Sequence, residues 1–378
     1  MTKLNPQDFL DPLLAAGVDF FAGVPDSVLK DFCWAVDAAL PAGRHIIAAN
    51  EGAAVGMAAG HYIGTGHVPA VYLQNSGLGN AINPLLSLAD AEIYGVPLLL
   101  IVGWRGAPGL KDEPQHLKQG RLTPPLLDAM EIPWWVLQDH LDDIPGLVAA
   151  ALAKAVGRLG PVAILVHNGL FAAYDGPKPA SPVQPPLARE AALKLVLDNL
   201  RPDDLVVGTT GMISRELHDL RVASGKGHAQ DFMMVGSMGH AMSLALSLAL
   251  AQPERRVICL DGDGAALMHL GGLSNIGALA PDNLLHVIVN NGAHDSVGGQ
   301  PSLGFHVDFP QIALACGYRH ADRAETEAEI AALLGSHQTG PSLIDLWVAK
   351  GARADLGRPK IGPRENIDLL MRHLGTAE

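Results

Sequence analysis

The chain is predicted to fold into two α/β domains, each built around a doubly wound parallel sheet. Short apolar runs of the kind that form buried parallel strands alternate with helical stretches along the whole sequence. In the first half, these strand-like runs lie at residues 45–49, 68–74, 96–104 and 161–168. In the second half, they lie at residues 205–211, 256–262, 284–291 and 342–349. The repeated alternation indicates one sheet in each half.

A proline-rich stretch separates the two halves. An extended linker tolerates such a density of proline better than a helix or a strand does. The prolines concerned are Pro177, Pro179, Pro182, Pro185 and Pro186. We therefore expect a first domain at 1–175, a linker at 176–188 and a second domain at 189–378. The chain of 378 residues is long enough for two ordinary domains, and the linker leaves no room for a third between them.

Composition restricts the classes of function. The formal net charge of −13, without a stripe of lysine and arginine, argues against nucleic-acid binding. Cys33, Cys259 and Cys316 are far apart and form no C-x-x-C pair, so we expect reduced thiols. The N-terminal residues lack the apolar centre of a signal peptide, and no apolar run reaches membrane-spanning length. We expect a soluble cytoplasmic protein, in which an anionic substrate would need a local basic pocket.

Two strand ends carry the most informative residues. One apolar run ends in Asp-Gly-Asp-Gly at 261–264, and the next ends in Asn-Asn-Gly at 290–292. Ligands bind at the carboxyl ends of parallel strands, and carboxylate and amide oxygens suit Mg²⁺, which keeps other positions for water and phosphate. Gly262 and Gly264 would let the main chain approach a phosphate closely. The pair of motifs predicts a metal–diphosphate site, although the first motif alone could be an ordinary tight turn.

Together the motifs resemble the signature of the thiamin diphosphate enzymes, in which Asn-Asn follows Gly-Asp-Gly after about two dozen residues. Here 25 residues separate the motifs. The resemblance implies that the side chains of Asp263 and Asn291 and the main-chain carbonyl of Ala293 bind Mg²⁺. Because the gap is slightly long, Asn290 with the carbonyl of Gly292 is an alternative. The resemblance also implies a two-domain version of the fold, with the pyrimidine-binding domain first, the diphosphate-binding domain second and no middle domain.

The resemblance places Glu51 against the pyrimidine ring of the coenzyme. This glutamate lies near the start of a segment rich in alanine and glycine, residues 48–60, which is predicted to be helical. The chemistry needs a carboxylic acid beside N1′ of the pyrimidine, and a desolvated glutamate with a raised pKa suits that role. The family builds its site between subunits, so we expect a homo-oligomer, a dimer or larger. Alternatively, the glutamate is simply favoured in the first turn of a helix.

Further cofactor-binding positions follow from the family by spacing. Met238 lies 25 positions before Asp263, where relatives place a bulky apolar residue against the cofactor, and the Gly236 carbonyl would accept a hydrogen bond from the 4′-amino group. Met238 could instead be a flexible core residue. Weaker candidates for the diphosphate are Thr209, Thr210, Gly211 and the main-chain N–H groups of Gly264 and Ala265; the first three could instead simply form a turn.

Four segments spanning both halves narrow the resemblance to the phosphonopyruvate decarboxylases. These segments are residues 23–32, 74–80, 103–116 and 290–301. The implied reaction is non-oxidative decarboxylation of 3-phosphonopyruvate, a small anionic 2-oxoacid, to phosphonoacetaldehyde and CO₂ in phosphonate biosynthesis. The sulfopyruvate decarboxylases share part of this resemblance and are the nearest alternative. A subunit of a thiamin-dependent 2-oxoacid oxidoreductase is the alternative from another class, although this chain has no cysteine cluster for an iron–sulfur centre.

Candidates for substrate binding and proton transfer lie in loops that follow strand ends. His116 could transfer protons because an unperturbed imidazole titrates near neutrality, and His294, just after the metal motif, is expected to face the site. Charged loop residues are often only solvated, and an aspartate or serine could simply cap the next helix. The substrate candidates are Asp26, Ser27, Arg105, Lys111, His116 and Lys118.

Overall fold

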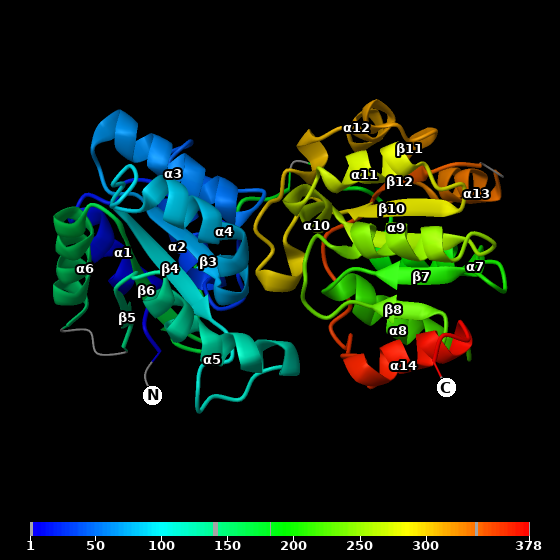
Figure 1. Cartoon of the computed structure of the whole chain (residues 1–378), viewed down its shortest axis with the longest axis horizontal. Helices are drawn as coiled ribbons and strands as arrows, with labels where there is room; N and C mark the ends of the chain where they lie inside the picture. The colour runs from blue at the N-terminus through cyan, green and yellow to red at the C-terminus, as the bar shows by residue number, and fades with distance from the viewer. Residues whose placement is uncertain (1–2, 139–142, 182, 337–338, 378) are drawn as a thin grey trace. The chain divides into compact units, whose positions relative to one another are not determined.

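The computed structural model describes residues 3–138, 143–181, 183–336 and 339–377 (Figure 1). The chain divides into two compact units, Met1–Ala180 and Ser181–Glu378. Each unit contains a six-stranded sheet with helices on its faces, and every strand pairing within the described residues is parallel. The predicted fold class, two parallel-sheet α/β domains, is therefore confirmed.

The first unit has the strand order β2-β1-β3-β4-β6-β5. Its strands are β1 (Phe21–Gly23), β2 (His45–Ile47), β3 (Ala70–Gln74), β4 (Leu98–Trp104), β5 (Trp134–Val136) and β6 (Pro161–His167). Its helices are α1 (Pro6–Ala15), α2 (Lys30–Ala39), α3 (Glu51–Thr65), α4 (Leu78–Pro84), α5 (Pro114–Ala129) and α6 (Ile144–Arg158), with short turns η1 (Asn75–Gly77) and η2 (Leu85–Ala89). Helices α1, α2 and α6 cover one face of the sheet, and α3, α4 and α5 cover the other.

The second unit has the strand order β11-β12-β10-β9-β7-β8. Its strands are β7 (Leu205–Gly208), β8 (Asp231–Met233), β9 (Val257–Gly262), β10 (Leu284–Asn290), β11 (His320–Ala324) and β12 (Ser342–Trp347). Its helices are α7 (Arg189–Asp198), α8 (Met212–Ala223), α9 (Ala241–Ala251), α10 (Asp263–Met268), α11 (Gly272–Leu279), α12 (Phe309–Cys316), α13 (Glu327–Gly335) and α14 (Pro363–His373), with turns η4 (Asp295–Val297) and η5 (Gly304–His306).

Parallel register brings the predicted strand ends of the second unit to one edge. Gly262 of β9 lies opposite Val289 of β10, and Gly208 of β7 lies opposite Leu260 of β9. The inner strands are apolar on both faces, and β10 is buried along its whole length. Because all three strands end together, the polar residues that follow them meet at the carboxyl edge of the sheet.

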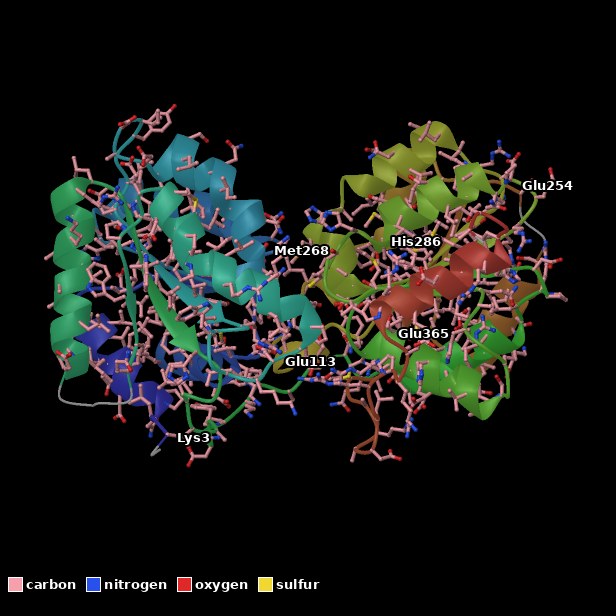
Figure 2. The ribbon with its side chains drawn as sticks, turned by 60° about the horizontal axis from the view of Figure 1, so that its bottom comes forward. Lys3, Glu113, Glu254, Met268, His286 and Glu365 are labelled. Carbon is pink, nitrogen blue, oxygen red and sulfur yellow. The ribbon has the colours of Figure 1, made fainter. Side chains whose placement is uncertain are left out.

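The region between the units contains no helix or strand among its described residues from 176 to 187. Pro182 of the predicted linker lies outside the described residues. No described helix is both long enough and apolar enough to cross a membrane. The three cysteines are free thiols; Cys33 and Cys259 are buried, and Cys316 is partly exposed. Figure 2 shows the side chains of both units.

Close helix packing in the second unit depends on one glycine. Gly277 of α11 faces α12, and a Cβ at this position would lie 1.8 Å from the main-chain oxygen of Cys316. Because the clash is with backbone rather than with a movable side chain, the helices would have to separate.

We expect Gly277→Ala to lower the free energy of unfolding by about 1–3 kcal/mol, the usual cost of overpacking. Urea denaturation of the full chain measures it. Gly335→Ala is the matched control, since a Cβ at that helical position meets nothing within 4 Å, and it should be neutral or mildly stabilising. Equal stability of the two variants would contradict the packing argument.

Candidate active site

Asp263 is the buried carboxylate at the centre of the second unit's strand edge. It begins α10 directly after β9 and is 3% exposed. Its side chain accepts hydrogen bonds from the Ser302 hydroxyl and from the main-chain N–H of Asn291. Burial raises the pKa of Asp263 to about 6, and the hydrogen bonds oppose that rise. A carboxylate that is buried in this way gains most from a bound cation.

The two asparagines at the end of β10, Asn290 within the strand and Asn291 just after it, have different surroundings. Asn290 is fully buried and donates from Nδ2 to the Gly304 carbonyl at 2.9 Å and to Asp345 at 3.1 Å. Asn291 donates from Nδ2 to Asp295 at 3.3 Å, and its Oδ1 accepts from the Ala293 N–H at 3.1 Å. Both amide hydrogens of Asn290 are therefore committed inside the protein.

A second group of predicted residues meets beside Gly264. A Cβ at Gly264 would lie 3.0 Å from Cε1 of His294 and 3.4 Å from Cε of Met238, so the absence of a side chain lets both approach. Burial lowers the pKa of His294 to about 4, which keeps the ring neutral at pH 7. A neutral imidazole can accept a proton but is a poor acid at that pH.

The loop before Met238 contacts the residues that follow β7. Gly236 has a left-handed φ of 78° and donates its N–H to Thr210 Oγ1 at 3.0 Å. Gly211, with φ of 104°, precedes α8. Thr209, the first residue of the predicted diphosphate segment, is 2% exposed, and its hydroxyl has no hydrogen-bond partner among the described residues. A buried free hydroxyl at this edge is suited to an anionic ligand.

Glu51 occupies the corresponding edge of the first unit. It is the first residue of α3, 5% exposed, and Oε2 accepts a hydrogen bond from Asn80 Nδ2 at 2.7 Å. A Cβ at Gly77 would lie 2.1 Å from Oε1, so only glycine fits there. Burial raises the pKa of Glu51, and the bond from Asn80 partly opposes this. The local environment therefore favours the protonated carboxyl group that the predicted role requires.

Arg105 is held by a carboxylate that the sequence analysis missed. Asp112 accepts from Arg105 Nε at 2.8 Å and also contacts Nη2, while Nη1 donates to Ser27 Oγ at 2.7 Å. The main-chain N–H groups of Gly106 and Glu113 donate to the same carboxylate at 2.7 and 2.8 Å; Glu113 is labelled in Figure 2. The charge of Arg105 is thus already neutralised, and its guanidinium orients Ser27.

Asp26 lies beneath this cluster and is fully buried. Its Oδ2 accepts from the N–H groups of Val28 and Leu29 at 3.0 and 3.2 Å, whereas Oδ1 has no partner among the described residues. Burial raises the pKa of Asp26 to about 6, and the charge of Arg105 opposes the rise. The hydrogen bonds to the turn before α2 satisfy only half of this carboxylate.

The remaining substrate candidates differ in exposure. Lys111 and Lys118 are exposed. His116, in the first turn of α5, is partly buried, and its Nδ1 has no partner among the described residues. Burial lowers the pKa of His116, and the positive charge of Arg105 lowers it further. His116 is therefore neutral at pH 7.

Comparison with known proteins identifies the family. The model "Thiamine pyrophosphate enzyme, N-terminal TPP binding domain" matches residues 7–132, and "Thiamine pyrophosphate enzyme, C-terminal TPP binding domain" matches 207–346. Phosphonopyruvate decarboxylase of Streptomyces viridochromogenes is 40% identical, covering 96% of this chain and 93% of that protein. The chain belongs to the phosphonopyruvate decarboxylase family of thiamin diphosphate enzymes. The resemblance predicted from the sequence is confirmed.

Two further relatives show the extent of the similarity. Phosphonopyruvate decarboxylase of Streptomyces hygroscopicus is 39% identical, over 96% of this chain and 92% of the relative. Sulfopyruvate decarboxylase of Methanosarcina acetivorans is 27% identical, over 86% of each protein. Similarity to the phosphonopyruvate decarboxylases thus extends along nearly the whole chain, while similarity to the sulfopyruvate enzyme is weaker.

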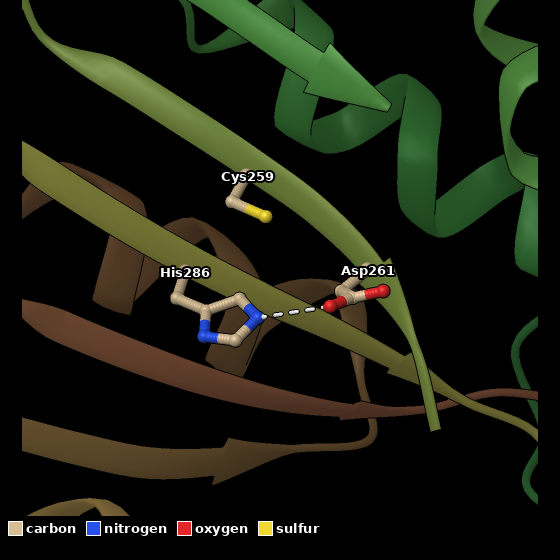
Figure 3. A group of neighbouring side chains, drawn as sticks. All are labelled: Cys259, Asp261 and His286. Atoms are coloured by element: carbon tan, nitrogen blue, oxygen red, sulfur yellow. Dashed lines mark ion pairs between the residues drawn. The ribbon is translucent and has the colours of Figure 1, made fainter. Parts of the chain in front are cut away.

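A separate buried cluster lies within the sheet of the second unit. His286 of β10 faces Asp261 of β9 with 3.6 Å between Nε2 and Oδ2, and Cys259 lies beside them (Figure 3). The other ring nitrogen of His286 contacts the Tyr318 hydroxyl at 3.2 Å. The cluster offers three possible metal ligands, whereas a structural zinc site has four. We interpret the cluster as a buried polar network within the sheet.

The raised pKa of Asp26 generates a stability prediction. A pKa of about 6 against an ordinary value near 4 means that ionisation of Asp26 costs the folded state about 3 kcal/mol. The cost is absent below pH 4 and fully present above pH 6. Asp26→Asn should therefore be more stable than the wild type at pH 7.5, and the difference should shrink toward pH 4.

Denaturant unfolding at several pH values measures this difference. Asp11→Asn, the same change at an exposed position, is the control and should show no such pH dependence. If the stability difference between Asp26→Asn and the wild type is constant from pH 4 to 7.5, the pKa of Asp26 is not raised in the folded state.

Proposed function

We propose that the protein decarboxylates 3-phosphonopyruvate to phosphonoacetaldehyde and CO₂, without redox change, in phosphonate biosynthesis. The observation that supports this proposal most strongly is the 40% identity to a phosphonopyruvate decarboxylase over 96% of the chain. Thiamin diphosphate, once bound, would supply the electron sink for the departing carboxylate. We assign residues 1–175 to the pyrimidine-binding domain, 176–188 to the linker and 189–378 to the diphosphate-binding domain.

Mg²⁺ would be held by the side chains of Asp263 and Asn291 and by the Ala293 carbonyl. The buried carboxylate of Asp263, with a pKa raised to about 6, fits a site that needs a cation. We favour Asn291 over Asn290 on the family pattern, since both asparagines are buried and the oxygen of each accepts the main-chain N–H two residues further on. The Asn291 N–H is also the group that donates to Asp263.

The coenzyme would be held by groups from both units. Glu51 would share a proton with N1′ of the pyrimidine, which its raised pKa favours. Met238 would support the rings, and the Gly236 carbonyl would accept from the 4′-amino group. Because the family builds its site between subunits, we propose a homo-oligomer, a dimer or larger. The diphosphate donors would be Thr210, Gly211, Gly264 and Ala265, together with the Thr209 hydroxyl, for which the described part of the chain supplies no partner.

The substrate would be bound by the loop that precedes α5. With a net charge of −13, the protein needs local positive charge to hold a dianion. Lys111 of this loop and Lys118, which lies in α5 rather than in the predicted loop, are exposed cations. Arg105, already paired with Asp112, would position Ser27 and Asp26 rather than carry the phosphonate alone. His116 and His294, both with lowered pKa values, would accept protons rather than donate them at pH 7.

The deciding experiment compares three substrates. The full chain with thiamin diphosphate and Mg²⁺ should release CO₂ from 3-phosphonopyruvate with a higher kcat/KM than from sulfopyruvate or pyruvate. A preference for sulfopyruvate would favour the second candidate function, for which the 27% identical relative provides the support. Absence of release from all three would contradict both assignments.

Replacement of Lys111 by alanine should lower kcat/KM for phosphonopyruvate by about 10- to 100-fold, the value of one hydrogen bond to a charged group. Pyruvate, which has no phosphonate, should be affected much less. Lys154→Ala, an exposed lysine of α6, is the control. An equal loss for both substrates would remove Lys111 from phosphonate recognition.

Glu51→Gln should lower CO₂ release by at least about 10²-fold, since glutamine cannot exchange a proton with the pyrimidine. The substitution keeps the shape and the contact with Asn80, so the melting temperature should change little. Glu92→Gln, at an exposed position, is the control. Near-normal turnover by the Glu51→Gln variant would rule out the assigned role.

A further inference from the structure

Asp295 joins three segments of the second unit through one oxygen atom. Its Oδ2 accepts from Arg189 Nη1 at 2.8 Å, from the Gly351 N–H at 2.9 Å and from Asn291 Nδ2 at 3.3 Å. The segments concerned are the start of α7, the chain after β12 and the loop after β10. Asp295 therefore ties the predicted metal loop to two other parts of the unit.

The chemistry of a carboxylate fixes the orientation of Asn291. An ionised aspartate can only accept hydrogen bonds, so the amide of Asn291 must turn its nitrogen toward Asp295. Its oxygen then faces the opposite side, where it accepts the Ala293 N–H at 3.1 Å and keeps a further lone pair. A metal ligand needs this orientation, because the amide binds Mg²⁺ through oxygen and never through its NH₂ group.

Arg189 in turn holds Asp295 in place. Its side chain is only 3% exposed, and it pairs in a bidentate manner with Glu216 of α8 at 2.8 and 2.9 Å. The remaining terminal nitrogen points to Asp295. Arg189 directly follows the linker, and beside it the Leu187 carbonyl accepts the Ala349 N–H at 2.7 Å. The ion pair is thus rigid on its arginine side.

We propose that Asp295 is a positioning residue that holds the Asn291 amide with its oxygen toward Mg²⁺, and that Arg189 fixes Asp295 for this purpose. The proposal rests on the function proposed above, because it concerns the ion of that same site. Partners of metal ligands fix ligand orientation, and their loss costs about 10- to 100-fold in metal affinity. The aspartate itself does not touch the ion or the substrate.

The test is Asp295→Asn in the full chain. Asparagine has nearly the same shape, but it presents an NH₂ group as well as an oxygen and no longer fixes the Asn291 amide. Mg²⁺ and, separately, Mn²⁺ are titrated in the presence of thiamin diphosphate and followed by tryptophan fluorescence and thermal melting. We expect the metal midpoint to rise by at least about 10-fold, and the metal-free protein should still fold, since Arg189 keeps its bidentate pair with Glu216.

Asp355→Asn is the matched control. Asp355 also pairs with an arginine, at 2.9 Å from Arg353, but its side chain is 80% exposed. The metal midpoint of this control should equal that of the wild type. A midpoint for Asp295→Asn within twofold of the wild type would overturn the proposal. If that variant does not fold, Asp295→Glu, which keeps the charge but displaces the carboxylate, takes its place with the same expected loss.

Metal titrations without substrate distinguish a failure of this proposal from a failure of the proposed function. Asp263→Asn removes a ligand and should abolish the metal response. If the wild type shows no response to Mg²⁺ and thiamin diphosphate, the proposed function fails. If the wild type responds, Asp263→Asn does not, and Asp295→Asn binds as the wild type does, only the positioning role of Asp295 fails.

Discussion

The burial of carboxylates at the carboxyl edges of parallel sheets is the constraint on which the candidate site depends. Glu51, Asp26 and Asp263 each lie almost completely out of solvent, and burial raises the pKa of each. A charged group in such a place is costly unless a partner compensates it. Binding a proton or a cation from outside the chain would therefore remove the cost of burying each of these negative charges.

The three carboxylates are compensated to different degrees, and this matches their different proposed roles. Asp263 receives a hydroxyl and a main-chain N–H, which hold it in place for an ion. Glu51 receives one side-chain amide, which leaves a carboxyl group able to keep a proton. Asp26 uses one oxygen on two main-chain N–H groups and leaves the other without a partner among the described residues. The three carboxyl groups therefore differ in their burial and hydrogen-bond partners more than in their residue type.

Much of the fold and of the candidate site could be predicted from the sequence. The failures concern short strands and side-chain contacts that no sequence pattern indicates. The longer apolar runs predicted eight strands, and the metal motif and Glu51 stood out because each lies within one continuous segment. The strands not predicted, β1, β5, β8 and β11, have three to five residues, which is short for a periodic pattern; β2, also of three residues, was found only through the run at 45–49. The partners Asn80 and Ser302 were missed because tertiary packing brings them to Glu51 and Asp263. Asp112 was missed because the irregular loop that returns it to Arg105, seven residues earlier, has no periodic pattern. No local pattern encodes such contacts.

The pairing of β9 with β10 also bears on how such a chain can diverge. Their alignment is fixed by six consecutive residue pairs, so the two halves of the proposed ion site keep their relative places when the connection between them changes in length. The intervening crossover contains α10, α11 and the turns that join them to the strands. Insertions or deletions in those turns alter the count of residues between the motifs without moving any ligand. Homologues are therefore free to drift in crossover length, and the alignment of strands, not a fixed interval, preserves the chemistry.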